Sequence, residues 1–274
     1  GGLVEKVHAA NKKIVMSLGG DGATSQMAAL IGTPAQQTFA NNVAAKMLEW
    51  GYDGVDFDFE FPGRDSTPAE FTEFFRMIKD AVRAVKSDAL VMFGIGPGWW
   101  LAEYQWAELG ALADYGFYFC YDWSNPQRGP VTKPGAPYNI NGGGQLKEAS
   151  CRGGIDYMIG QGFPAEKVVV GLPFSSVGGS LYRNAPSAVL NGIPEGNSLE
   201  VNIGTDWWTN SAAITMKTNA FLDPTQSVLC SLPDGDCSGG AVAAGVGFWH
   251  FGQENYESGA DLSTAMRNAV DALK

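Results

Sequence analysis

The sequence predicts an α/β fold in which helices pack on a parallel sheet. Short β-rich apolar runs alternate with helical stretches along almost all of the 274 residues, which is typical of consecutive βα units. A chain of this length can bury one large core, and it contains no internal repeat or long linker. We therefore expect a single domain over residues 1–274.

Six strands are expected, each a short apolar run, most of them bounded by Gly or Pro. They cover residues 14–18, 55–61, 90–95, 116–121, 167–172 and 244–251.

The clearest helix covers residues 66–85, where Ser66-Thr67-Pro68 is a start signal and apolar residues recur at helical spacing. Residues 175–240 are rich in Gly, Asn, Ser and Pro and are expected to form a long ordered insertion. Further helices are expected over residues 34–50, 101–112, 144–161 and 262–273.

The composition excludes some classes of partner. A net charge of −11 and a pI near 4.6 argue against binding a nucleic acid or an anionic membrane surface, because both would be repelled. The apolar runs are shorter than the roughly 18 residues that cross a bilayer, so we expect no membrane span. A neutral or weakly cationic partner fits this charge better.

The four cysteines suggest one disulfide. Cys230 and Cys237 bracket a turn-rich segment and could close a short loop in an oxidising compartment. Cys120 and Cys151 are expected to be buried thiols. Because no ligand spacing typical of a metal site is present, we expect neither a metal nor a cofactor.

Acids alternate with aromatic residues in the segment 56–60, Asp-Phe-Asp-Phe-Glu. The two-residue period of a strand sends Asp56, Asp58 and Glu60 to one face and both Phe rings to the other. Three neighbouring carboxylates repel, so at least one pKa should rise until a proton is held at neutral pH. Such a proton suits general acid catalysis.

Two other interpretations of these acids remain open. They could face water, or they could bind calcium or magnesium, although cations usually need ligands from several directions and these come from one straight strand. Asp53 has the opposite strand parity and precedes Gly54. It is therefore expected to cap the turn into the strand.

Residues 53–60 resemble the D-G-x-D-x-D-x-E signature of family 18 glycoside hydrolases, the chitinases and their relatives. Residues 17–20 resemble the family's S-x-G-G strand end, residues 119–122 its M-x-Y-D strand, and Trp249 the tryptophan of its final strand. The resemblance implies a TIM-type (β/α)₈ barrel with its active site at the carboxyl ends of the strands.

The resemblance also implies roles in catalysis. Glu60 would protonate the glycosidic oxygen while the N-acetyl carbonyl of the substrate attacks the anomeric carbon with retention. Asp58 would orient the acetamido group, Asp56 would share a proton with Asp58, and Tyr121 would hold the acetamido oxygen.

The remaining candidates are substrate-binding or structural. Asp122 would contact the sugar, and Trp249 would form an apolar floor under the ring. Trp99 and Trp123 are expected to stack on the sugar chain. Ser17, Gly19 and Gly20 are expected, like Asp53, to be structural.

The first expected strand, residues 14–18, resembles the third strand of the family, so counterparts of the first two strands are not visible. We therefore expect an incomplete barrel. Its two open edges favour either pairing with another chain or coverage by a loop. A homodimer is the hypothesis that follows from the first of these.

Hydrolysis of β-1,4 bonds between N-acetylglucosamine units of chitin or chitooligosaccharides is the predicted function, in a secreted protein. The alternatives are a chitin-binding lectin of weak or no activity and an endo-β-N-acetylglucosaminidase acting on glycans.

Overall fold

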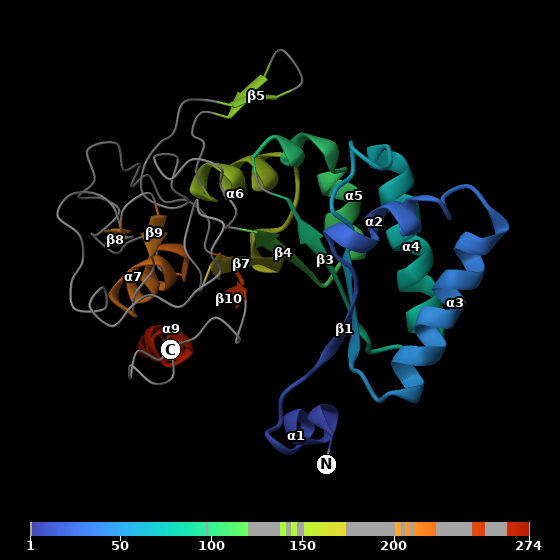
Figure 1. Ribbon diagram of the computed structural model, residues 1–274, viewed down its shortest axis with the longest axis horizontal. Coiled ribbons are helices and arrows are strands. Elements are labelled where there is room, and N and C mark those ends of the chain that lie inside the picture. The colour runs from blue at the N-terminus through green and yellow to red at the C-terminus, as the bar shows by residue number, and fades with distance from the viewer. Residues whose placement is uncertain are drawn as a thin grey trace. The chain divides into compact units, whose positions relative to one another are not determined.

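The structure is a computed structural model (Figure 1). It describes residues 2–96, 98–119, 138–140, 144–146, 151–173, 201–203, 206–208, 211–222, 243–249 and 262–273. Contacts divide the chain into two compact units. The first contains residues 1–96, 100–116 and 161–163, and the second contains residues 97–99, 117–160 and 164–274.

A six-stranded parallel sheet is the main β-structure, with the order β1-β2-β3-β4-β7-β10. Its strands are β1 (Val15–Gly19), β2 (Gly54–Asp58), β3 (Leu90–Ile95), β4 (Tyr115–Phe119), β7 (Val168–Pro173) and β10 (Gly245–Trp249). All six predicted strands are confirmed, although β2 ends at Asp58 rather than at residue 61. Among the described strands the order is open, with β1 and β10 at its ends, as expected for an incomplete barrel.

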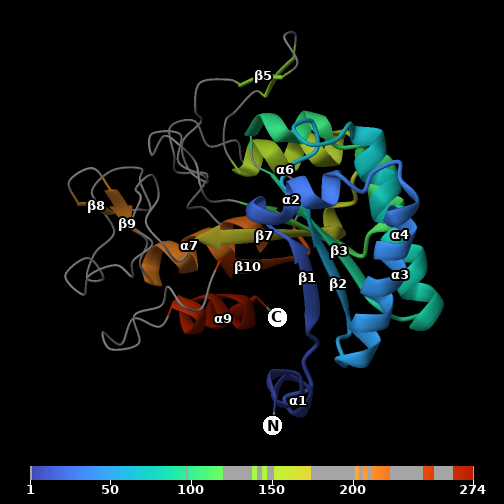
Figure 2. The ribbon, with the colours of Figure 1, turned by 45° about the vertical axis from the view of Figure 1, so that its right-hand side comes forward.

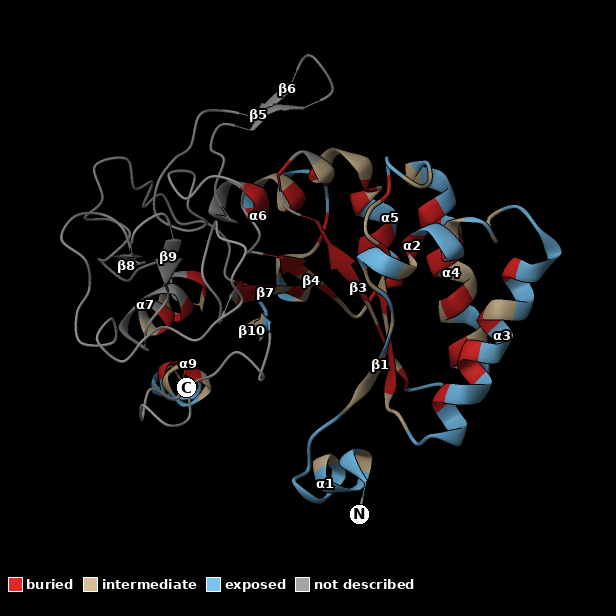
Figure 3. Cartoon of the chain, viewed as in Figure 1, coloured by how far each residue is buried: buried red, intermediate tan, exposed pale blue. Residues whose placement is uncertain are grey.

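The first unit holds β1–β3 and most of the helices that precede β4. These helices are α1 (Leu3–Ala9), α2 (Asp21–Ala28), α3 (Pro34–Glu49), α4 (Pro68–Val85), the 3₁₀ helix η1 (Gly98–Glu103), at the boundary between the units, and α5 (Trp106–Leu112). Helices α3 and α4 pack against each other and lie along the same side of β1–β3 in both views (Figures 1 and 2). Buried residues of both helices face inward and their outer sides are exposed (Figure 3).

Helix α4 begins where the sequence predicts. Thr67 caps it: its Oγ1 accepts the Glu70 N–H at 3.2 Å, while Glu70 Oε2 accepts the Thr67 N–H at 2.8 Å, a reciprocal pair that satisfies two helix-end donors. The apolar stripe of the helix is fully buried at Phe71, Phe74 and Phe75. These rings form the core behind β2.

Two helix predictions need correction. The helix expected over residues 101–112 is divided into η1 and α5, and between them the Tyr104 hydroxyl turns into the core and accepts the Gly96 N–H at 2.9 Å. In the segment 144–161 the helix α6 (Cys151–Gly160) begins later, because β6 (Gly144–Leu146) pairs antiparallel with β5 (Tyr138–Ile140). Three successive glycines at 142–144 disfavour a helix there.

The second unit carries β7 and β10, which pair from Val169↔Gly245 to Pro173↔Trp249. The helices described in this unit are α6, η3 (Ala165–Lys167), α7 (Ser211–Leu222) and α9 (Leu262–Ala272). The helix predicted over residues 262–273 is thus confirmed, as is the one over residues 34–50. None of the described helices is long and apolar enough to cross a membrane.

Part of the predicted insertion is described: β8 (Val201–Ile203) pairs antiparallel with β9 (Asp206–Trp208), and α7 follows. The rest of residues 175–240 lies outside the described ranges. Cys120, Cys230 and Cys237 also lie outside them, and of Cys151 only the backbone is described. The disulfide stays a prediction.

Candidate active site

Strand β2 separates acids from aromatic rings, as the alternation predicts. Phe57 and Phe59 are 0% and 1% exposed, and the Phe57 ring stacks on Phe71 of α4 with centroids 5.6 Å apart. Asp56 and Asp58 leave the opposite face and are partly buried. The packing of the rings thus fixes the direction of the carboxylates.

Asp56 lies beside Ser17 of the neighbouring strand, since the two residues are partners in the register of β1 and β2. Ser17 Oγ donates to Asp56 Oδ2 at 2.9 Å. Burial raises the pKa of Asp56, and this hydrogen bond opposes the rise. Asp56 Oδ1 is buried and accepts no hydrogen bond from any group that the structure describes.

Asp58 is the last residue of β2 and faces Gly19 of β1. A Cβ on Gly19 would lie 2.1 Å from the Asp58 backbone oxygen, and Gly19 has a φ of +119°. Glycine is therefore required at this position. The Gly20 N–H donates to the same Asp58 oxygen at 2.8 Å, so the turn after β1 is joined to the end of β2.

The Asp58 carboxyl holds a proton up to neutral pH. Burial, followed by repulsion from Glu60 and Asp56, raises its pKa to about 7. Within the described part of the chain, no group donates a hydrogen bond to the buried Asp58 Oδ1. Burial and nearby like charges both favour the protonated form of a carboxyl group.

Glu60 lies two residues beyond the end of β2 and is partly buried. Its N–H donates to Thr24 Oγ1 of α2 at 2.9 Å, and its carbonyl oxygen accepts a hydrogen bond from Arg64. Glu60 also contributes to the raised pKa of Asp58. The three predicted acids therefore form one electrostatically coupled row.

Tyr104 is a neighbour of this row that the sequence did not identify. Burial raises the pKa of its hydroxyl, with smaller contributions from the charges of Asp58 and Glu60. Thr24 and Arg64, which bind the backbone of Glu60, were also not predicted. They lie in no recognised motif, and their only signal is proximity in sequence to residues 17–20 and 53–60.

Asp53 is placed away from the acids. Its carboxylate accepts the Ile14 N–H at 2.9 Å and lies 2.8 Å from His8 Nε2. It thus joins α1 and the segment before β1 to the start of β2, rather than capping its own turn.

The aromatic candidates are only partly described. Trp249 ends β10 in the second unit and is 52% exposed. Tyr121, Asp122 and Trp123 lie outside the described residues, as does the side chain of Trp99. Their predicted roles remain predictions.

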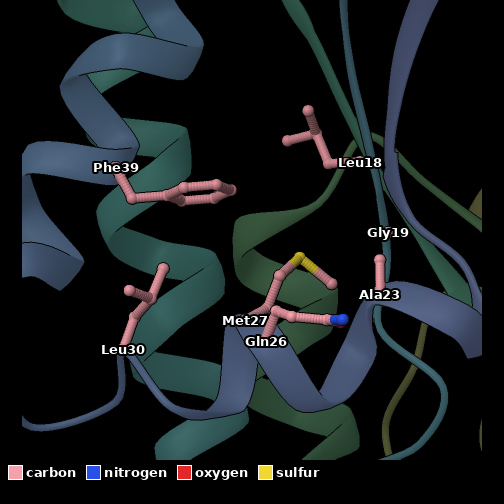
Figure 4. Close-up of a pocket in the computed structure, with 7 residues that line it drawn as sticks. All are labelled: Leu18, Gly19, Ala23, Gln26, Met27, Leu30 and Phe39. Atoms are coloured by element: carbon pink, nitrogen blue, oxygen red, sulfur yellow. The ribbon is translucent and has the colours of Figure 1, made fainter.

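An apolar cavity of about 540 Å³ lies beside α2 (Figure 4). It is lined by Leu18, Gly19, Ala23, Gln26, Met27, Leu30 and Phe39. None of these side chains is titratable, and the acids of residues 56–60 do not line the cavity. Within the described ranges, no group of three or more His, Cys, Asp or Glu side chains is arranged to hold a metal ion.

Solved structures share the fold at low sequence identity. The Group IV chitinase of Ostrinia furnacalis in complex with allosamidin aligns with a TM-score of 0.69 and 17% identity, over 99% of this chain and 82% of that chain. A chitinase-like agglutinin from Robinia pseudoacacia aligns with a TM-score of 0.67 and 19% identity, over 97% of this chain and 84% of that one. The fold is therefore that of the TIM-barrel relatives.

Sequence comparison identifies the family. Chitinase 1 of Aphanocladium album is 28% identical over 186 residues, which are 60% of this chain and 40% of that protein. The chain spans about two fifths of the length of the curated relatives that it matches. The model of the family described as "Glycosyl hydrolases family 18" matches residues 3–228, and the chain belongs to this family.

Proposed function

We propose that this chain hydrolyses the β-1,4 glycosidic bonds between N-acetylglucosamine units of chitin or chitooligosaccharides. The observation that carries the proposal is the row of coupled acids, in which Asp58 has a pKa of about 7 beside Asp56 and Glu60. The family gives this row its chemical context, and several of the matched relatives are named chitinases.

Glu60 acts first as the general acid. It gives its proton to the glycosidic oxygen as the bond from that oxygen to the anomeric carbon breaks. The acetamido oxygen of the same sugar attacks the anomeric carbon and forms a cyclic oxazolinium ion. No nucleophile from the protein is then needed.

Glu60 then acts as the general base. It takes a proton from a water molecule, whose oxygen attacks the anomeric carbon and opens the ring of the oxazolinium ion. Two inversions at this carbon give net retention. The proton lost in the first step is thereby restored.

Asp58 orients the acetamido group and stabilises the positive charge that develops on it. Asp56 takes part by sharing a proton with Asp58. This sharing is supported by the raised pKa values of both carboxyl groups and by the two buried Oδ1 atoms, which no described donor reaches.

The sugar-binding roles belong to the same proposal. Tyr121 holds the acetamido oxygen, Asp122 contacts the sugar, and Trp249 lies under the ring, where its exposed indole is available for stacking. Trp99 and Trp123 extend the platform. Because chitin is an extracellular polymer, we also propose that the protein acts outside the cell.

Hydrolysis of a chromogenic chitooligosaccharide tests the proposal, with Glu60→Gln as the key variant. Loss of the proton donor should lower kcat by about 10²- to 10⁴-fold, while binding of the oligosaccharide persists. Glu49→Gln is the control, because Glu49 pairs only with exposed Lys46 on α3 among the described residues.

A wild-type chain that binds the oligosaccharide but releases no product would overturn the proposal and favour a chitin-binding lectin. Turnover of a glycoprotein glycan in preference to chitooligosaccharides would instead indicate an endo-β-N-acetylglucosaminidase.

A further inference from the structure

Glu60 lies beyond the point where β2 pairs with its neighbouring strands. The register with β1 ends at Asp58, and the register with β3 ends at Phe57. The hydrogen bonds of the described sheet therefore stop before the residue that must be placed most accurately. Its backbone instead contacts α2.

Thr24 binds the N–H side of Glu60. Thr24 is 0% exposed, and its Oγ1 donates to the Gly20 carbonyl at 3.0 Å while accepting the Glu60 N–H at 2.9 Å. Both functions of one buried hydroxyl are thereby used. The hydroxyl connects the first turn of α2 directly to the peptide group of the acid.

Arg64 binds the carbonyl side of Glu60. Its guanidinium donates to the Glu60 carbonyl oxygen, to Asp65, and through Nη1 to Asp21 Oδ1 at 3.1 Å. Asp21 is the first residue of α2. The carbonyl group is thus also connected to α2, through one ion pair.

Packing holds α2 only in part. Ala23, Gln26 and Met27 of this helix line the cavity of about 540 Å³ (Figure 4). Side chains that border a cavity lack van der Waals partners on that side. The position of α2 consequently depends more on the polar contacts at its first turn than it would if the helix were packed on all of its inner side.

We propose that α2 positions the general acid, with Thr24 and the Asp21–Arg64 pair as positioning residues that hold the two polar groups of the Glu60 backbone. The inference rests on the hydrolytic function proposed above. None of these three residues touches substrate in this role. They act by keeping the Glu60 carboxyl within reach of the glycosidic oxygen, and a shift of about 1 Å can reduce the rate about 10²-fold.

Thr24→Val is the test at the N–H side, because it keeps the shape of the side chain and removes the hydroxyl. We expect kcat to fall about 10- to 100-fold with KM changed less than about threefold. Thr24→Ser restores the oxygen and should recover most of the rate.

Thr72→Val is the matched control for this change. Thr72 is also buried in a helix, and its Oγ1 donates to the carbonyl four residues earlier, Pro68, at 2.9 Å. Thr72→Val removes the same hydroxyl and the same type of hydrogen bond as Thr24→Val. Thr72, however, lies on α4 and does not contact Glu60. Its kcat should stay within about twofold of wild type.

Arg64→Gln tests the carbonyl side with a change on the surface that leaves the core intact. Arg76→Gln is its control, since Arg76 is 40% exposed against 43% for Arg64 and also pairs with two acids, Glu73 and Glu108. We expect Arg64→Gln to lower kcat by about three- to tenfold and Arg76→Gln to leave it unchanged.

Exchange of the Glu60 amide hydrogen, followed by NMR, provides a readout that needs no activity. Thr24→Val should accelerate this exchange by about fivefold or more, the equivalent of one lost hydrogen bond, and Thr72→Val should not. Unchanged exchange and unchanged kcat in Thr24→Val would overturn the positioning role even if Glu60→Gln confirms hydrolysis. If the wild-type chain shows no turnover, the proposed function fails, and the exchange result alone then decides whether α2 holds Glu60.

Discussion

Asp58 shows how one side chain combines stability with function. It is partly buried at the end of β2, with Asp56 on the same face and Glu60 close enough to repel it, and its pKa is raised to about 7. Ionisation of this carboxyl therefore lowers the free energy of unfolding. The same property lets it hold or share a proton during catalysis, which is a common conflict between stability and activity at active sites.

The pH dependence of stability follows from the sign of this shift. Between the ordinary value of 3.8 and about 7, the folded chain binds more protons at Asp58 than the unfolded chain does. The free energy of unfolding therefore falls as pH rises through this range, by up to about 1.4 kcal/mol per pH unit for one group.

Asp58→Asn should remove the loss of stability that occurs as the pH rises, because the amide does not ionise. In urea unfolding we expect the variant to be more stable than wild type by roughly 2 kcal/mol at pH 8, and similar to wild type near pH 4. Its kcat should nevertheless fall about 10²-fold or more. Asp88→Asn on the exposed surface is the control, and equal effects of the two changes at pH 8 would contradict a raised pKa at Asp58.

The predictability of the site differs from residue to residue. Asp56, Asp58 and Glu60 could be predicted to share one face because a strand has a period of two, and the structure places Asp56 and Asp58 on that face. Thr24 and Arg64 could not be predicted, because their contacts with Glu60 depend on how α2 and the loop after β2 meet in space. Tyr104 was missed for the same reason, since it lies between η1 and α5 and is brought near the acids only by the fold.

At the scale of elements, strands were easier to predict than short helices. The six strands are apolar runs with clear limits, and α4 has both a capping box and a stripe of Phe residues. Helix α2 has neither, because its eight residues include Gly22, Thr24 and Ser25, which favour turns and caps. Its position is determined by the glycine turn after β1 and by its contacts with Glu60.

The turn between β1 and α2 depends on Gly19. Gly19→Ala would place a Cβ 2.1 Å from the Asp58 oxygen at a φ of +119°, so the strand ends would have to separate. We expect a loss of about 2–4 kcal/mol in the free energy of unfolding, measured in urea, with reduced activity.

Gly22→Ala is the comparison for that change. Gly22 lies in α2, only three residues away, and an added Cβ would have no atom within 4 Å. This variant should be neutral or more stable by about 0.5 kcal/mol. A similar loss of stability in both variants would show that the close approach of β1 to β2 is not the reason that glycine is needed.

At the scale of the whole molecule, the sequence predicted the sheet and its open order but not all of its surroundings. The alternation of strands and helices can be recognised from short segments of sequence. The strands of the hairpins β5–β6 and β8–β9 have only three residues each, which is too short for a clear alternation of apolar and polar residues.

Strand β1 has β2 as its only partner among the described strands. Pairing of two copies through such an edge stays a prediction. Light scattering should show a dimer, and a monomer would contradict the prediction.

The net charge of −11, from 29 acidic and 18 basic residues, predicts how salt should affect the substrates. A fully acetylated chitooligosaccharide is neutral, so its KM should change little when the ionic strength rises. A partly deacetylated oligosaccharide carries ammonium groups at pH 6 and is attracted over a distance that shrinks from about 30 Å at 10 mM salt to about 10 Å at 100 mM. We therefore expect its KM to rise about threefold over this range, measured with oligosaccharides of equal length. Equal salt dependence for the two substrates would contradict long-range attraction by the acidic chain, because only one of them carries the charge on which that attraction acts.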